Sequence, residues 1–150
     1  MSAREHDADI REWLSRAQDD LRWAEHSLAG GFLPQACFAC QQAAEKALKS
    51  FLLACGEGIV RTHSLPSLLD TATDFDADLY QLQDSAIVLD VYYAPTRYAD
   101  VLVQLDYTPE RVQDAIQRAR TLVNELALRI ESASYWETDE SNSRDVQQEP

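Results

Sequence analysis

The sequence contains few of the glycine and proline residues that form turns, and it lacks the long apolar segments that cross membranes. It contains only four glycines and five prolines in 150 residues, too few for the many turns of an all-β fold. No apolar run approaches the roughly 20 residues that span a bilayer, and the opening MSAREHDADIREW lacks the charged-then-apolar pattern of a signal peptide. We therefore expect one soluble, cytoplasmic domain without a membrane segment.

Positive charge is scarce as well. The sequence has 13 Lys and Arg residues and 26 Asp and Glu residues, which gives a formal net charge of −13 and an isoelectric point near 4.4. Broad binding to a phosphate backbone normally needs clustered cations. The composition therefore argues against a general nucleic-acid-binding surface, although it leaves room for a small local positive site.

The acidic residues are dense at the C-terminal end. The stretch ESASYWETDESNSRDVQQEP contains six acidic residues against one arginine, with little apolar periodicity. Such a composition is typical of a solvated segment. We predict a helical domain over residues 1–134, followed by an acidic, disordered tail over residues 135–150.

Cysteine is present in an odd number, three, which does not suggest a disulfide framework. Cys37 and Cys40 form a CxxC pair. As a zinc half-site the pair lacks a second pair, since His26 and Cys55 are not at convincing spacing. As a redox motif it lacks the strand–turn–helix context. We interpret it as two small buried residues one helical turn apart, and we expect no metal and no cofactor.

Apolar side chains recur at helical spacing, and no segment alternates like a strand. Residues 10–28 carry a single apolar stripe, which predicts a helix of about 20 residues that ends at Gly30-Gly31. Residues 34–55 are apolar almost all round, so we expect that helix to run through the middle of a bundle.

Three further helices complete the prediction of an all-α antiparallel bundle. One begins at Ser64 as N-cap, with Pro66 in its first turn. Another covers residues 77–93. The last begins at Thr108 as N-cap, with Pro109 at the first helical position.

A polar stripe interrupts the apolar surface of the second helix. Gln42, Glu45, Lys46 and Lys49 fall at positions i, i+3, i+4 and i+7, so they share one face. The spacing favours a solvated edge with a Glu45–Lys49 ion pair. The alternative is the polar wall of a cleft or of a dimer seam.

Arg97 lies in the segment YYAPTRYAD, among three tyrosines. Its guanidinium is suited to meet a phosphate, and the tyrosines would then supply stacking or hydroxyl contacts; they are Tyr92, Tyr93 and Tyr98. The alternative is that Arg97 pairs with Asp100 or Asp90 and that the tyrosines belong to the core. His63 is a further candidate, although a lone histidine before a helix start more often ties down a loop.

Three stretches, taken in order and spacing, resemble a HEPN domain. They are CQQAAEKALKSFL (40–52), THSLPSLL (62–69) and YYAPTRYAD (92–100), and the resemblance covers roughly residues 9–131. It implies an up-and-down bundle of four main helices plus a short one, usually a homodimer. It also implies a neighbouring gene for a minimal nucleotidyltransferase, the two proteins often forming a toxin–antitoxin pair.

The sequence departs from the RNA-cutting members of that family. Those proteins carry an arginine followed, four to six residues later, by a histidine. Here Arg97 is followed by YADVLVQLDY, and the three histidines, His6, His26 and His63, all lie upstream. Half of the acid–base apparatus is therefore missing, so RNase activity becomes the alternative rather than the favoured interpretation.

The resemblance and the residues together predict a homodimeric nucleotide-binding or nucleotidyltransferase-partner module. The candidate nucleotide- or phosphate-binding residues are Arg97, Tyr92, Tyr93, Tyr98, Lys46, Lys49 and His63. Two alternatives stay open: a metal-independent RNase toxin with an altered active site, and a structural adaptor that binds neither nucleotide nor RNA.

Overall fold

The computed structural model describes residues 3–58, 60–93 and 105–144, and the side chains of residues 5–58, 60–93 and 105–132. Its elements are α1 (Ala3–Ala29), α2 (Leu33–Ala54), α3 (Leu65–Thr73), the 3₁₀ helix η1 (Ala77–Leu82), α4 (Gln83–Asp90) and α6 (Pro109–Arg144). Arg97 and Tyr98 lie outside the described residues.

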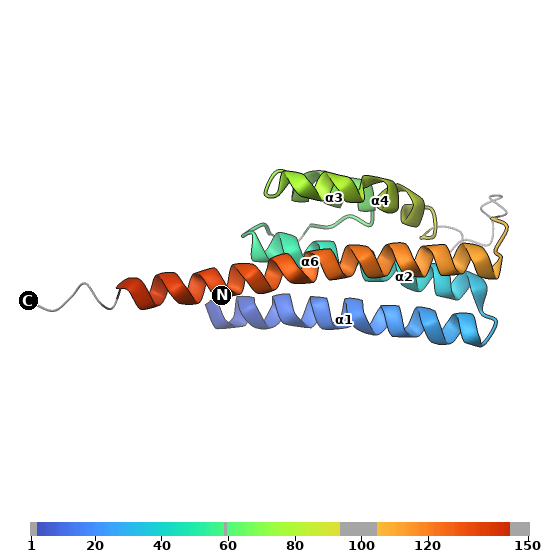
Figure 1. Ribbon diagram of the computed structural model, residues 1–150, viewed down its shortest axis with the longest axis horizontal. Coiled ribbons are helices and arrows are strands. Elements are labelled where there is room, and N and C mark those ends of the chain that lie inside the picture. Colours follow the sequence, from blue (N-terminus) through green and yellow to red (C-terminus); the bar gives the residue numbers. More distant parts are fainter. Residues whose placement is uncertain (1–2, 59, 94–104, 145–150) are drawn as a thin grey trace, which may run out of the picture.

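The three long helices α1, α2 and α6 lie side by side, and α1 runs antiparallel to α2 (Figure 1). The short helices α3 and α4 pack together on α2, on the side away from α1, and α4 also contacts α6. The predicted all-α bundle is confirmed. The arrangement buries α2 between α1, α6 and the α3–α4 pair.

The turn between α1 and α2 follows the prediction. Gly31 has a φ of +81°, a conformation that glycine adopts without steric cost. The amide of Phe32 donates to the carbonyl of Ser27 at 2.8 Å, which closes the end of α1. At its other end α1 begins at Ala3, earlier than predicted. His6 there bonds through Nε2 to the Leu53 carbonyl at 2.7 Å, a polar contact that leaves no trace in an apolar pattern.

Helix α2 is the centre of the core, as predicted. Five of its alanines are completely buried: Ala36, Ala39, Ala43, Ala44 and Ala47. Small side chains let the neighbouring helices approach closely, so much of the packing is between backbones. Cys37 and Cys40 are buried, free thiols on this helix, which confirms their interpretation as small core residues.

Two predicted helix starts are confirmed by their capping bonds. The Ser64 hydroxyl accepts from the amide of Ser67 at 3.3 Å, and the Thr108 hydroxyl accepts from the amide of Arg111 at 3.2 Å. Each bond satisfies an amide that has no partner inside its own helix.

The single helix predicted over residues 77–93 is wrong. Residues Ala77–Leu82 form the 3₁₀ helix η1, and α4 ends at Asp90. The Asp76 side chain caps η1 by accepting from the amide of Asp78 at 3.0 Å. Because side chains three residues apart eclipse one another in a 3₁₀ helix, Leu79 and Leu82 both reach the core.

Helix α6 continues past the predicted domain boundary at residue 134 and ends at Arg144. Ile130 is the last of its buried residues among the described side chains. The division of the chain at residue 134 stays a prediction. None of the helices in the described ranges combines the length and the apolar character needed to cross a bilayer.

Candidate functional site

A buried carboxylate organises the polar face of α2. Glu45 is only 5% exposed. Its Oε1 accepts from Gln41 Nε2 at 3.3 Å and bonds to His63 Nδ1 at 2.9 Å, while its Oε2 accepts from Lys49 Nζ at 3.2 Å. The favoured interpretation of the stripe as a solvated edge is therefore wrong for Glu45, although the Glu45–Lys49 ion pair is confirmed. We call Gln41, Glu45, Lys49, His63 and Tyr93 the Glu45 cluster.

The segment between α2 and α3, which we call the connector, is held against this cluster by two contacts. Gln41 Nε2 donates to the His63 carbonyl at 3.2 Å. The His63 ring stacks on the Tyr93 ring, with centroids 4.5 Å apart and planes 15° from parallel. The His63 side chain nevertheless remains 56% exposed, so it is the part of the cluster that faces solvent.

The bond to Glu45 also sets the tautomer of His63. A carboxylate oxygen accepts hydrogen bonds, and Glu45 Oε1 is the atom that faces His63 Nδ1. Nδ1 therefore carries the hydrogen and donates to Glu45. In neutral His63 this leaves the lone pair on Nε2, for which the described residues offer no hydrogen-bond partner.

Both lysines of the stripe are paired with carboxylates. Lys46 Nζ donates to Asp20 Oδ2 on α1 at 2.6 Å, and only 23% of the Lys46 side chain is exposed. Burial raises the pKa of Asp20, while the bond to Lys46 acts in the opposite direction. Lys49 is 13% exposed at its side chain and bonds to Glu45. The two cations are thus neutralised locally rather than held free for an anion.

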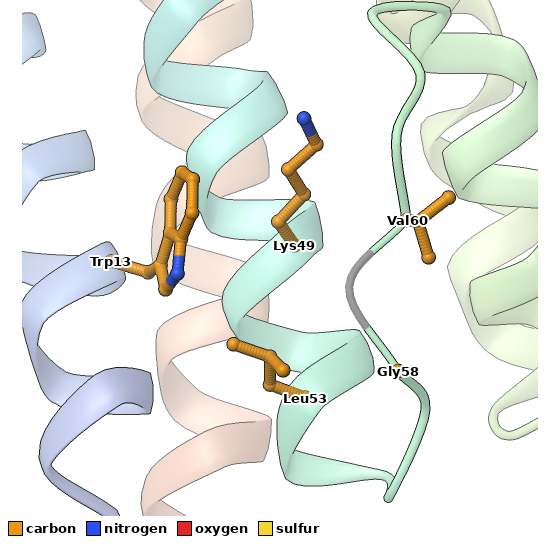
Figure 2. Close-up of a pocket in the computed structure, with 5 residues that line it drawn as sticks. All are labelled: Trp13, Lys49, Leu53, Gly58 and Val60. Carbon is orange, nitrogen blue, oxygen red and sulfur yellow. The ribbon is translucent and has the colours of Figure 1, made fainter. Parts of the chain in front are cut away.

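A small groove lies beside the Lys49 end of the cluster. Figure 2 shows Trp13 from α1, Lys49 and Leu53 from α2, and Val60 from the connector around it. Lys49 Nζ lies 5.9 Å from the centroid of the Trp13 ring, within range of a cation–π interaction. The groove is therefore apolar except for the Lys49 ammonium.

The adjacent tyrosines Tyr92 and Tyr93 have separate environments. Tyr92 is 2% exposed, and its ring centroid lies 6.3 Å from that of Tyr107. Burial raises the pKa of the Tyr92 hydroxyl. Packing accounts for Tyr92, so we leave it out of the proposed site. Tyr93 instead contacts His63 and, at 6.3 Å between centroids, Phe38.

The structure describes five of the seven residues expected from the sequence and brings three of them together: Lys49, His63 and Tyr93. Lys46 lies one turn away on α2 in its own ion pair. Sequence reasoning missed Gln41, which is fully buried, and Asp20. Gln41 had a usable signal, because a glutamine four residues before Glu45 on an otherwise apolar helix is placed to bond to it. The described residues contain no group of three or more His, Cys, Asp or Glu side chains that could hold a metal ion.

Known proteins share this architecture. Residues 10–130 match the HEPN domain. TT1696 from Thermus thermophilus is 38% identical, over 79% of this chain and 95% of its own, with a TM-score of 0.69. ST0689, an archaeal HEPN homologue, is 34% identical over 81% of this chain and 97% of its own, with a TM-score of 0.66.

A HEPN domain protein from Thermotoga maritima is 29% identical, over 85% of this chain and 98% of its own, with a TM-score of 0.52. No curated protein matches the chain. The match to the family covers most of the described bundle, and this chain covers TT1696 and ST0689 almost completely. The chain therefore belongs to the HEPN domain family.

Proposed function

We propose that this HEPN protein is a homodimeric, non-catalytic module that binds a nucleotide or a minimal nucleotidyltransferase partner, as one half of a toxin–antitoxin pair. The observation that carries the proposal is the Glu45 cluster. Its centre is a buried carboxylate with three hydrogen-bond partners, and it ends in a His63–Tyr93 stack whose histidine is exposed to solvent. A polar network of this kind is costly to bury and is often found at binding sites.

The charge balance of the cluster supports an arginine, rather than a lysine, as the phosphate ligand. Lys46 and Lys49 are matched by Asp20 and Glu45, so neither lysine is left to neutralise an anion. Arg97 follows Tyr93 by four residues in the sequence. A charge-assisted contact from a guanidinium to a phosphate contributes about 1.5–3 kcal/mol.

The dimer proposal rests on exposed apolar surface. Trp23 is 46% exposed and Phe32 is 60% exposed, close together in sequence around the α1–α2 turn. Exposed large apolar side chains are typical of interaction surfaces. We expect sedimentation at micromolar concentration to give a dimer, and a monomer there would contradict this part of the proposal.

The decisive variant is Arg97→Ala. We expect it to weaken nucleotide binding about tenfold to a hundredfold, the equivalent of one lost charge-assisted contact, and to leave the melting temperature unchanged. Isothermal titration with the four ribonucleoside triphosphates and a thermal melt of the same sample measure both quantities. The matched control is Arg22→Ala, which removes an exposed guanidinium on α1 that pairs with Asp19.

Other outcomes favour other functions. A melting temperature lowered by several degrees with intact binding would mean that Arg97 serves the fold. Metal-independent cleavage of single-stranded RNA that is lost in Arg97→Ala would favour an RNase toxin. If neither nucleotide nor RNA nor a nucleotidyltransferase is bound, the protein is a structural adaptor.

A further inference from the structure

A row of four aromatic rings crosses the bundle and ends at His63. Trp23 on α1 meets Phe38 on α2 edge-to-face at 6.4 Å, Phe38 meets Tyr93 at 6.3 Å, and Tyr93 stacks on His63 at 4.5 Å. Tyr93 covers one face of the imidazole. Since 56% of the His63 side chain is exposed, the open area belongs to the opposite face and to the ring edge. Within the described part of the chain, the row therefore ends in an aromatic ring with a second ring against only one of its faces.

The His63 ring makes more contacts than are needed to hold the connector in place. The backbone of the connector is already held by the bond from Gln41 to the His63 carbonyl and by the Ser64 cap of α3. The additional bond from the ring to Glu45 uses a carboxylate that is 5% exposed and that needs Gln41 and Lys49 as further partners. Burying such a charge is unfavourable unless it is well bonded, so the arrangement specifies the position of the imidazole itself.

We infer that the free face of His63 is the stacking surface for the base of a nucleotide, and that Glu45 is the positioning residue that holds the ring in place. This inference rests on the proposed nucleotide binding and names its base site. Bases stack well on aromatic rings whatever their sequence identity, and a ring held in advance loses little freedom when the ligand arrives.

A cation is present on the same connector. Arg61 is exposed, lies two residues before His63 and forms no ion pair within the described residues. A nucleotide whose base stacks on His63 would therefore have an exposed guanidinium two residues away along the chain, and a guanidinium is suited to contact a phosphate.

The first test uses the unmodified protein. Proton NMR of the His63 ring during titration with ATP should show an upfield shift of its carbon-bound protons, because a stacked base shields them. Nitrogen-15 spectra should show the hydrogen on Nδ1, as the bond to Glu45 requires. ATP binding without any shift of the His63 ring protons would overturn the inference.

The second test compares variants by titration with the same nucleotide. We expect His63→Ala to weaken binding about fivefold to a hundredfold, the range of one lost stacking partner. His63→Phe keeps a ring on Tyr93 and should bind within about threefold of the wild type. Glu45→Gln should weaken binding severalfold and give mixed tautomers of His63. His26→Ala, an exposed histidine on α1, is the matched control and should change nothing.

The outcomes separate this inference from the function on which it rests. If His63→Ala binds like the wild type, the base stacks elsewhere, and nucleotide binding itself stands. If the wild type binds no nucleotide, both proposals fail. If His63→Ala loses its fold, the ring-proton shifts of the wild type and the His63→Phe variant still decide between stacking and no stacking.

Discussion

Burial sets the chemistry of the three cysteine side chains. Burial raises the pKa of Cys37 to about 11, and it raises the pKa of Cys40, which is completely buried, as well. The thiolate is the reactive form of cysteine, so neither thiol of the CxxC pair is poised for redox chemistry or metal binding at neutral pH. Cys55, just after α2, is only partly buried.

We predict selective alkylation of the native protein at pH 7.5. Iodoacetamide should label Cys55 first, because it alone combines a free thiol with partial access to solvent. Cys37 and Cys40 should react only after unfolding in urea. Mass spectrometry of peptides measures the three rates, and Cys55→Ser should abolish labelling of the native state. Labelling of Cys37 as fast as in the unfolded chain would show that α2 is not packed as described.

At the scale of the element, α2 carries most of the packing that holds the bundle together. Among the described elements, it contacts α1, α3, α4 and α6, whereas α1 has extensive contacts only with α2 and α6. Its buried side chains are mostly small, so the few large ones, such as Leu48, fill the space between helices. Removing atoms from such a position leaves a cavity that the surrounding structure cannot fully close.

We predict that Leu48→Ala lowers the free energy of unfolding by about 2–5 kcal/mol. The matched control is Leu128→Ala on α6, where the leucine is 59% exposed and its removal should change stability by less than about 0.5 kcal/mol. Urea unfolding followed by circular dichroism measures both. Similar losses for the two variants would mean that Leu128 is covered, for example by a second copy of the chain.

At the scale of the whole molecule, α6 extends beyond the part of the chain that matches the HEPN family. The match ends at residue 130, and Ile130 is also the last buried residue on α6 among the described side chains. Helix α6 continues to Arg144 (Figure 1). Most of the stability of a helix comes from tertiary packing of its apolar face, so the packed part of α6 is expected to carry most of its contribution.

We predict that a chain ending at residue 134 melts within about 2 °C of the full-length protein, because it keeps Ile130, the last buried side chain of α6 within the described residues. A chain ending at residue 129 is the matched control. It lacks Ile130, which is 5% exposed, and should melt several degrees lower. A large loss on removal of residues 135–150 would show that this segment contacts the bundle or a second chain, and sedimentation of the same samples would distinguish the two.

The local features of the fold followed from the sequence alone. Helical periodicity, the glycine turn after α1 and the caps at Ser64 and Thr108 each depend on residues that are neighbours along the chain. The central place of α2 also followed, because a helix that is apolar on nearly every side must be covered on nearly every side. The 3₁₀ helix η1 was not predicted, since Leu79 and Leu82 suit an α-helix equally well.

The site depended on tertiary structure. Periodicity showed that Glu45, Lys46 and Lys49 share a face, but it could not show what covers that face. The face is covered by His63, eighteen residues beyond Glu45, which bonds to Glu45, and by Asp20 on α1, which pairs with Lys46. Whether a polar side chain on a helix is solvated or buried depends on what the neighbouring elements bring to it, and a pattern within one helix carries no information about its neighbours. The sequence by itself therefore determined the all-α bundle, the central place of α2 and the caps at Ser64 and Thr108. Only the packing of α1 and the connector against α2 decided that Glu45 is a buried carboxylate holding an exposed histidine.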